Sequence, residues 1–107
     1  MGNKISANES MDSILALMEY KRNFSASQKM RVVAKRNHEI IFNNRVIVGI
    51  GDYNFYQKVD IMWDDVKPDY HDIGLHGYYS TDFCRMEYDD GVLTISDGNG
   101  IEITITE

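Results

Sequence analysis

Three stretches near the C-terminus alternate apolar and polar residues, and this pattern restricts the fold more than any other feature of the chain. Residues 84–88, 92–96 and 101–106 show the two-residue period of strands with one buried face. Between them stand Asp89-Asp90-Gly91 and Asp97-Gly98-Asn99-Gly100, whose residue types favour tight turns. The pattern predicts a three-stranded antiparallel meander.

The N-terminal region carries the signals of a helix. Ser6 and Glu9 have the spacing of a capping box. We therefore expect a helix over residues 7–22 that packs on the sheet through an apolar stripe at helical spacing. That stripe consists of Met11, Ile14, Leu15 and Met18.

Residues 24–37 fit two structures. Ser25-Ala26-Ser27-Gln28 resembles a helix cap and we favour a second helix here, although the alternation of Met30, Val32 and Ala34 equally suits a strand. Next, residues 39–42 and 45–48 flank Asn43-Asn44. Because asparagine tolerates positive φ, this predicts a hairpin that turns at Asn43-Asn44, and Gly49 and Gly51 then predict a bulge or the strand end.

Alternation from Tyr56 to Trp63 predicts one more strand, with Val59, Ile61 and Trp63 on its buried face. Residues 64–81 predict an irregular loop, and ordered loops of that length are often functional. Together the elements predict one α+β domain over residues 1–107. One or two N-terminal helices pack on a mostly antiparallel sheet of about five to six strands that ends in the C-terminal β-meander.

Charge is divided unevenly between the two halves of the chain. Residues 1–50 hold eight Lys and Arg against four Asp and Glu, whereas residues 51–107 hold three against thirteen, for a net charge of −6. Such asymmetry concerns binding partners more than fold.

Several classes of protein are disfavoured. A single cysteine, Cys84, excludes an intrachain disulfide and is compatible with a reducing cytoplasm. No apolar run approaches the ~20 residues that span a bilayer, and no signal peptide is visible. Residues 1–6 fit a loose N-myristoylation pattern, but one acyl chain anchors weakly. We expect a cytoplasmic protein, in the host cytoplasm if it is phage-encoded, with no membrane partner.

No catalytic, metal or cofactor motif stands out. Asp69, His71, Asp72 and His76 have chemistry suited to a small metal-dependent or His-assisted hydrolase, but their spacing completes no ligand set. Cys84 lies on the apolar face of its strand, where thiols are usually inert. We expect no enzyme, no metal and no cofactor, and keep the hydrolase as the alternative.

Cations gather at Lys29, Arg31, Lys35 and Arg36, where they can contact phosphates. Four are few for a chain with a net charge of −6. The solvated face of a helix, or an internal counterweight to the acidic half, explains them equally well. We expect no direct nucleic-acid binding.

Aromatic and acidic residues coincide between residues 52 and 88, where nine of the twelve aromatics lie among eight carboxylates. Tyrosine and tryptophan supply rigid contact area at interfaces, and carboxylates steer basic partners. We therefore expect a partner-binding surface that consists of Trp63, Asp64, Asp65, Asp69, Tyr70, Asp72, Tyr78 and Tyr79.

The hypothesis that follows is a small acidic inhibitor that binds the basic, nucleic-acid-binding surface of another protein, with carboxylates in place of phosphates. Small acidic domains of this kind are typical of phage anti-defence proteins, including anti-CRISPRs, and of nuclease-immunity proteins. The analogy rests on size and charge, and no motif is matched. We expect a monomer or homodimer; a homo-oligomer built through an exposed edge of the meander is a third alternative.

Overall fold

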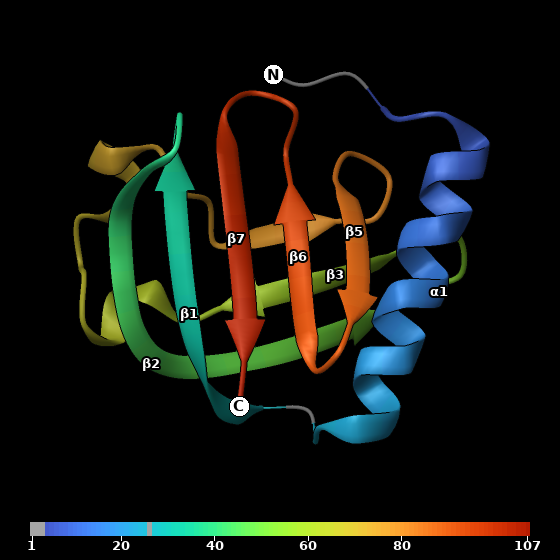
Figure 1. Ribbon diagram of the computed structural model, residues 1–107, viewed down its shortest axis with the longest axis horizontal. Coiled ribbons are helices and arrows are strands. Elements are labelled where there is room, and N and C mark those ends of the chain that lie inside the picture. The colour runs from blue at the N-terminus through green and yellow to red at the C-terminus, as the bar shows by residue number, and fades with distance from the viewer. Residues whose placement is uncertain (1–3, 26) are drawn as a thin grey trace.

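A computed structural model describes residues 4–25 and 27–107, in which one helix, α1 (Ala7–Asn23), packs on a curled antiparallel sheet (Figure 1). The sheet has seven strands in the order β4-β3-β2-β1-β7-β6-β5. The α+β expectation is confirmed, although five to six strands were expected. The strands are β1 (Gln28–Arg36), β2 (Glu39–Asp52), β3 (Gln57–Ile61), β4 (Tyr78–Ser80), β5 (Arg85–Asp89), β6 (Val92–Ser96) and β7 (Ile101–Thr106).

The sheet curls because β2 is long enough to serve two partners. Its first part pairs with β1, and its last five residues, Val48 to Asp52, pair with β3. As a result β3 crosses behind β5, β6 and β7 (Figure 1). The core lies between these two layers and is built from alternate residues of every strand, as a curled sheet with one buried face requires.

Helix α1 begins as expected. The Ser6 hydroxyl accepts a hydrogen bond from the Glu9 backbone N–H, and the Glu9 carboxylate accepts one from the Ser6 N–H, both at 3.2 Å. The expected stripe, however, is wrong: Met11, Leu15 and Met18 are 55%, 54% and 40% exposed, and Ile14 is half-buried.

A second set of residues at helical spacing forms the packed face of α1, namely Ser13, Leu17, Tyr20 and Phe24. It wins because the Ser13 hydroxyl meets the edge of β5, donating to the Cys84 carbonyl at 3.0 Å and accepting from the Met86 N–H at 2.9 Å. The edge of the meander is therefore covered by α1, so the oligomer alternative loses the exposed edge on which it rested.

The second helix expected in residues 24–37 is wrong, since most of this stretch is β1. Met30, Val32 and Ala34 are fully buried, so the strand alternative holds. β1 gains a hydrogen-bonded neighbour on both sides, β2 and β7, which a surface helix would forgo. Residue 26 of the expected cap, like residues 1–3 of the acylation pattern, lies outside the described residues.

The hairpin turn expected at Asn43-Asn44 is also misplaced. Both asparagines lie within β2, and the chain reverses instead at Asn37-His38, whose φ values of 48° and 72° give the two positive angles of a two-residue turn. Gly49 and Gly51 are inside β2 as well. The register shift of this hairpin falls between Ala34 and Lys35.

The later elements agree better with expectation. β3 corresponds to the strand expected at residues 56–63, and β5, β6 and β7 form the expected meander. The stretch expected to be an irregular loop contains two short 3-10 helices, η1 (Trp63–Asp65) and η2 (Tyr70–Ile73), followed by β4. It is fastened to the core by Trp63 and Leu75, which are both buried.

Candidate partner-binding surface

Two of the eight expected surface residues belong to the core. Trp63 is fully buried, lies edge-on to Phe42 with ring centroids 4.7 Å apart, and donates from Nε1 to the His76 carbonyl at 2.6 Å. Tyr79 is 3% exposed, and its hydroxyl accepts from the His76 N–H at 3.0 Å. Both side chains therefore position the β3–β4 connection and present no surface to a partner.

Tyr70 occupies an intermediate position. Its ring packs on the core and lies 4.2 Å, centroid to centroid, from the His71 ring. Its hydroxyl lies 3.3 Å from where a Cβ of Gly77 would stand, so the glycine leaves room for it beside the start of β4.

The four expected aspartates are all exposed on this connection. We call them the acidic segment: Asp64, Asp65, Asp69 and Asp72. The one lysine among them, Lys67, lies 2.8 Å from the Asp69 carboxylate. The hydrogen bond from Lys67 lowers the pKa of Asp69, so this carboxylate stays ionised well below neutral pH. The segment presents a local surplus of three negative charges.

The eighth residue, Tyr78, belongs to an exposed aromatic group that the sequence reasoning did not assemble. Lys58 Nζ lies 4.7 Å from the centre of the Tyr78 ring and 5.7 Å from that of Tyr53, and 3.4 Å from the Asp60 carboxylate. We call these four residues and Tyr56, which stacks on Tyr53 at 4.9 Å, the Lys58 cluster. Cation–π contacts hold its rings in fixed places.

Two neighbouring features frame the Lys58 cluster. Phe55, at the β2–β3 turn, is 87% exposed, the largest exposure of any apolar side chain in the described residues. Gly51 lies opposite Lys58 in the β2–β3 register, where a Cβ would stand only 3.0 Å from the Tyr53 ring and 3.1 Å from the Lys58 side chain. An in-strand glycine beside exposed aromatics was the sequence signal for this cluster.

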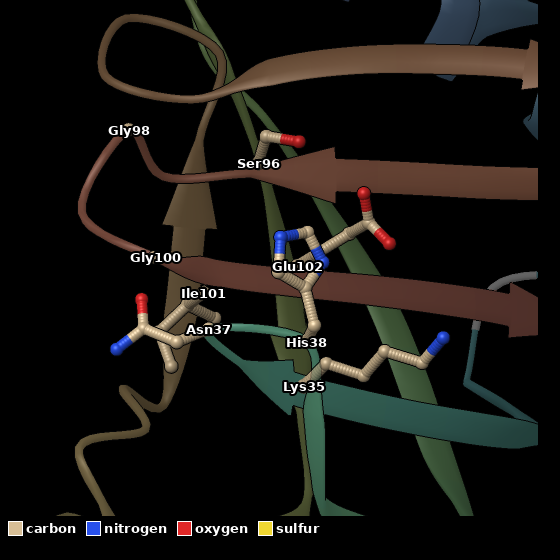
Figure 2. A pocket seen from close by; sticks show the side chains of 8 residues that line it. All are labelled: Lys35, Asn37, His38, Ser96, Gly98, Gly100, Ile101 and Glu102. Carbon is tan, nitrogen blue, oxygen red and sulfur yellow. The ribbon is translucent and has the colours of Figure 1, made fainter.

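A second concave region lies on the opposite, front side of the sheet. It is a shallow hollow of about 230 Å³ between the β1–β2 and β6–β7 turns, into which Lys35, His38, Ser96 and Glu102 project (Figure 2). The Asn37 N–H donates to the Gly100 carbonyl at 2.9 Å and joins the two turns. The hollow is wide open, so it lacks the enclosure with which small-molecule sites bury a ligand.

The residues of the hydrolase alternative do not converge. His71 stacks on Tyr70, and His76 faces Tyr79 with ring centroids 6.0 Å apart. In residues 4–25 and 27–107, no three His, Cys, Asp or Glu side chains are grouped so as to hold a metal ion. Burial raises the pKa of the Cys84 thiol to about 12, so it is no nucleophile at neutral pH.

Two searches bear on class. No helix in the described part of the chain is long and apolar enough to cross a membrane. Comparisons with protein-family models, with curated proteins and with solved structures find no match to this chain. A function must therefore be argued from the surface itself.

Proposed function

We propose that the chain is a small acidic inhibitor that binds the basic, nucleic-acid-binding surface of another protein. The observation that carries this proposal is the adjacency, along β3 and β4, of four exposed carboxylates and a fixed group of exposed aromatics. The acidic segment follows β3 and precedes β4, and the Lys58 cluster lies on those same two strands.

The two parts of this surface have different physical roles. Carboxylates at the rim attract a basic partner over a long range and raise the association rate, an effect that salt screens. Exposed aromatic rings that are already held in place lose little conformational entropy on binding, so they slow dissociation. Phe55 and Tyr78 are the residues best placed for this second role, because both are more than half exposed.

The test is kinetic. The wild-type chain is used to capture a basic protein from a lysate of the source cell, and association and dissociation rates are then measured with the purified target. Changing all four aspartates of the acidic segment to asparagine should slow association at low salt at least ~10-fold and have little effect at high salt. Changing Phe55 and Tyr78 to alanine should mainly speed dissociation.

A matched control neutralises four exposed carboxylates elsewhere, by D12N, E19Q, E39Q and E107Q. It changes net charge by the same amount, so it separates the location of charge from its total. If the control slows association as much as the acidic-segment variant does, or if the captured protein is not basic, the proposal is wrong.

A further inference from the structure

The outer face of β1 and β2 holds a group of cations that has no acidic partner. Lys29 and Arg31 are exposed on β1, on the side opposite the buried Met30 and Val32, and Arg45 is exposed on β2. We call Lys29, Arg31 and Arg45 the basic face. In residues 4–25 and 27–107, none of the three forms an ion pair with a carboxylate.

Arg31 and Arg45 are directly opposite each other in the β1–β2 register. Like charges in this position destabilise an antiparallel pair, and an acidic residue at either place would remove that cost. The described contacts of the two guanidinium groups are with uncharged oxygens: Arg31 donates to the Asn43 side-chain oxygen at 3.2 Å and Arg45 to the Lys29 carbonyl at 3.5 Å. The fold therefore leaves both positive charges available to an anion.

The two explanations offered for these cations from the sequence both fail at this face. Residues 28–36 are a strand, so the cations are not the solvated side of a helix. They are not an internal counterweight either, because the acidic segment pairs with Lys67 and not with them. Anion binding is the explanation that remains.

The surroundings favour phosphate over other anions. Thr106 lies opposite Arg31 on β7, Thr104 opposite Val33, and Asn43 beside them on β2. Hydroxyl and amide groups interspersed with Arg and Lys are the side chains that contact nucleic-acid backbones. No exposed large aromatic lies among these positions in the described structure, so there is no platform on which bases would stack.

We propose that the basic face binds the phosphate backbone of single-stranded nucleic acid without regard to sequence. This inference goes beyond the proposed function and does not depend on it, because it concerns the front of the sheet and not the β3–β4 surface. It also replaces the expectation of no direct nucleic-acid contact. With three cations the binding is weak, in the range of about 10⁻⁴ to 10⁻⁶ M typical of non-specific contacts.

Fluorescence anisotropy with a labelled single-stranded oligonucleotide of mixed sequence, titrated with the full chain at increasing salt, tests this proposal. Neutralising about three phosphates predicts a slope of log K against log salt near −2, and R31A/R45A should bring it to about −0.7 and weaken binding at least ~10-fold at low salt. The matched control K4A/R22A removes two exposed cations from elsewhere and should stay within about twofold of wild type.

Thermal unfolding checks that R31A/R45A remains folded, which is expected because it removes two opposed like charges from an exposed face. Competition with poly-L-glutamate distinguishes phosphates from the carboxylates of an acidic protein. Selective loss in R31A/R45A with no displacement by polyglutamate supports the proposal. Absence of binding at low salt, equal loss in both variants, or equal displacement by polyglutamate overturns it.

Discussion

Gly74 shows how one missing side chain joins two distant parts of this chain. It ends η2 with a φ of 84°, a left-handed conformation that disfavours a Cβ. A Cβ at this position would also overlap the guanidinium of Arg36, which donates to the neighbouring Ile73 carbonyl. The β3–β4 connection is thereby held against the end of β1.

We predict that Gly74→Ala destabilises the protein more than Gly98→Ala. Gly98 has a similar φ of 78°, but a Cβ there would have no neighbour within 4 Å, so it isolates the backbone cost of about 1 kcal/mol. Gly74→Ala should cost roughly 1 kcal/mol more, because it also breaks the hydrogen bond of Arg36. Urea unfolding measures both free energies. In an R36A background the difference should vanish; equal losses in the wild-type background would contradict the prediction.

Trp63 shows where reasoning from residue types failed although the pattern was informative. Its alternation with Val59 and Ile61 already predicted a buried side chain, and the structure buries all three. Its aromatic character nevertheless led us to include it in the expected partner surface. A pattern fixed by strand period was more reliable here than a preference of residue types for interfaces, because burial is decided by packing.

At the scale of elements, the sequence predicted the existence of α1 but not which side of it is packed. Met11, Leu15 and Met18 form the more apolar side and remain exposed, whereas the packed side includes Ser13 and Tyr20. Helical periodicity cannot show this, because the deciding contact is with backbone groups at the edge of β5, far along the chain.

We predict that Ser13→Ala costs about 2 kcal/mol of unfolding free energy. The change leaves the buried Cys84 carbonyl and Met86 N–H without their partner, and each unsatisfied buried group costs roughly 1 to 3 kcal/mol. Ser10→Ala, on the same helix, is the control and should change stability by less than about 0.5 kcal/mol. Guanidinium unfolding of both variants gives the comparison, and a loss for Ser13→Ala no larger than that of the control would show that α1 does not seal the edge.

The β1–β2 hairpin shows the same limit. Asn43-Asn44 and Asn37-His38 are both able to adopt positive φ, and local propensity does not choose between them. The choice follows from pairing: a turn at Asn37-His38 lets β1 lie between β2 and β7, with the Asn37 N–H bonded to the Gly100 carbonyl. That partner is more than sixty residues away.

For the whole molecule, the charge division seen in the sequence becomes a division between faces. The basic face lies on β1 and β2 at the front of the sheet, and the acidic segment follows β3, which crosses behind (Figure 1). The sequence predicted the imbalance between the halves of the chain. It did not predict the faces, because strand register decides which cations lie side by side.

The core also contains three side chains that ionise at high pH, and these predict how the whole fold responds to alkali. Burial raises the pKa of Tyr20 from 10.0 to about 12, with the nearby Tyr88 adding to the effect. Burial likewise raises the pKa of Tyr79 from 10.0 to about 12 and that of Cys84 from 9.0 to about 12. All three groups are at most 4% exposed.

We predict that the protein loses stability steeply with rising pH between about pH 9 and pH 12. In this window the unfolded chain releases these protons while the folded chain retains them, so the free energy of unfolding falls as pH rises; below about pH 9 their contribution is fully present. Denaturant midpoints measured from about pH 8 to pH 11 should decrease, with phenolate absorbance of the buried tyrosines appearing only on unfolding. Cys84→Ala should flatten the part of the decrease that begins near pH 9, because the thiol ionises first in the unfolded chain. A midpoint that stays constant to pH 11, or full phenolate absorbance in the folded protein, would mean that these groups are not held in the core.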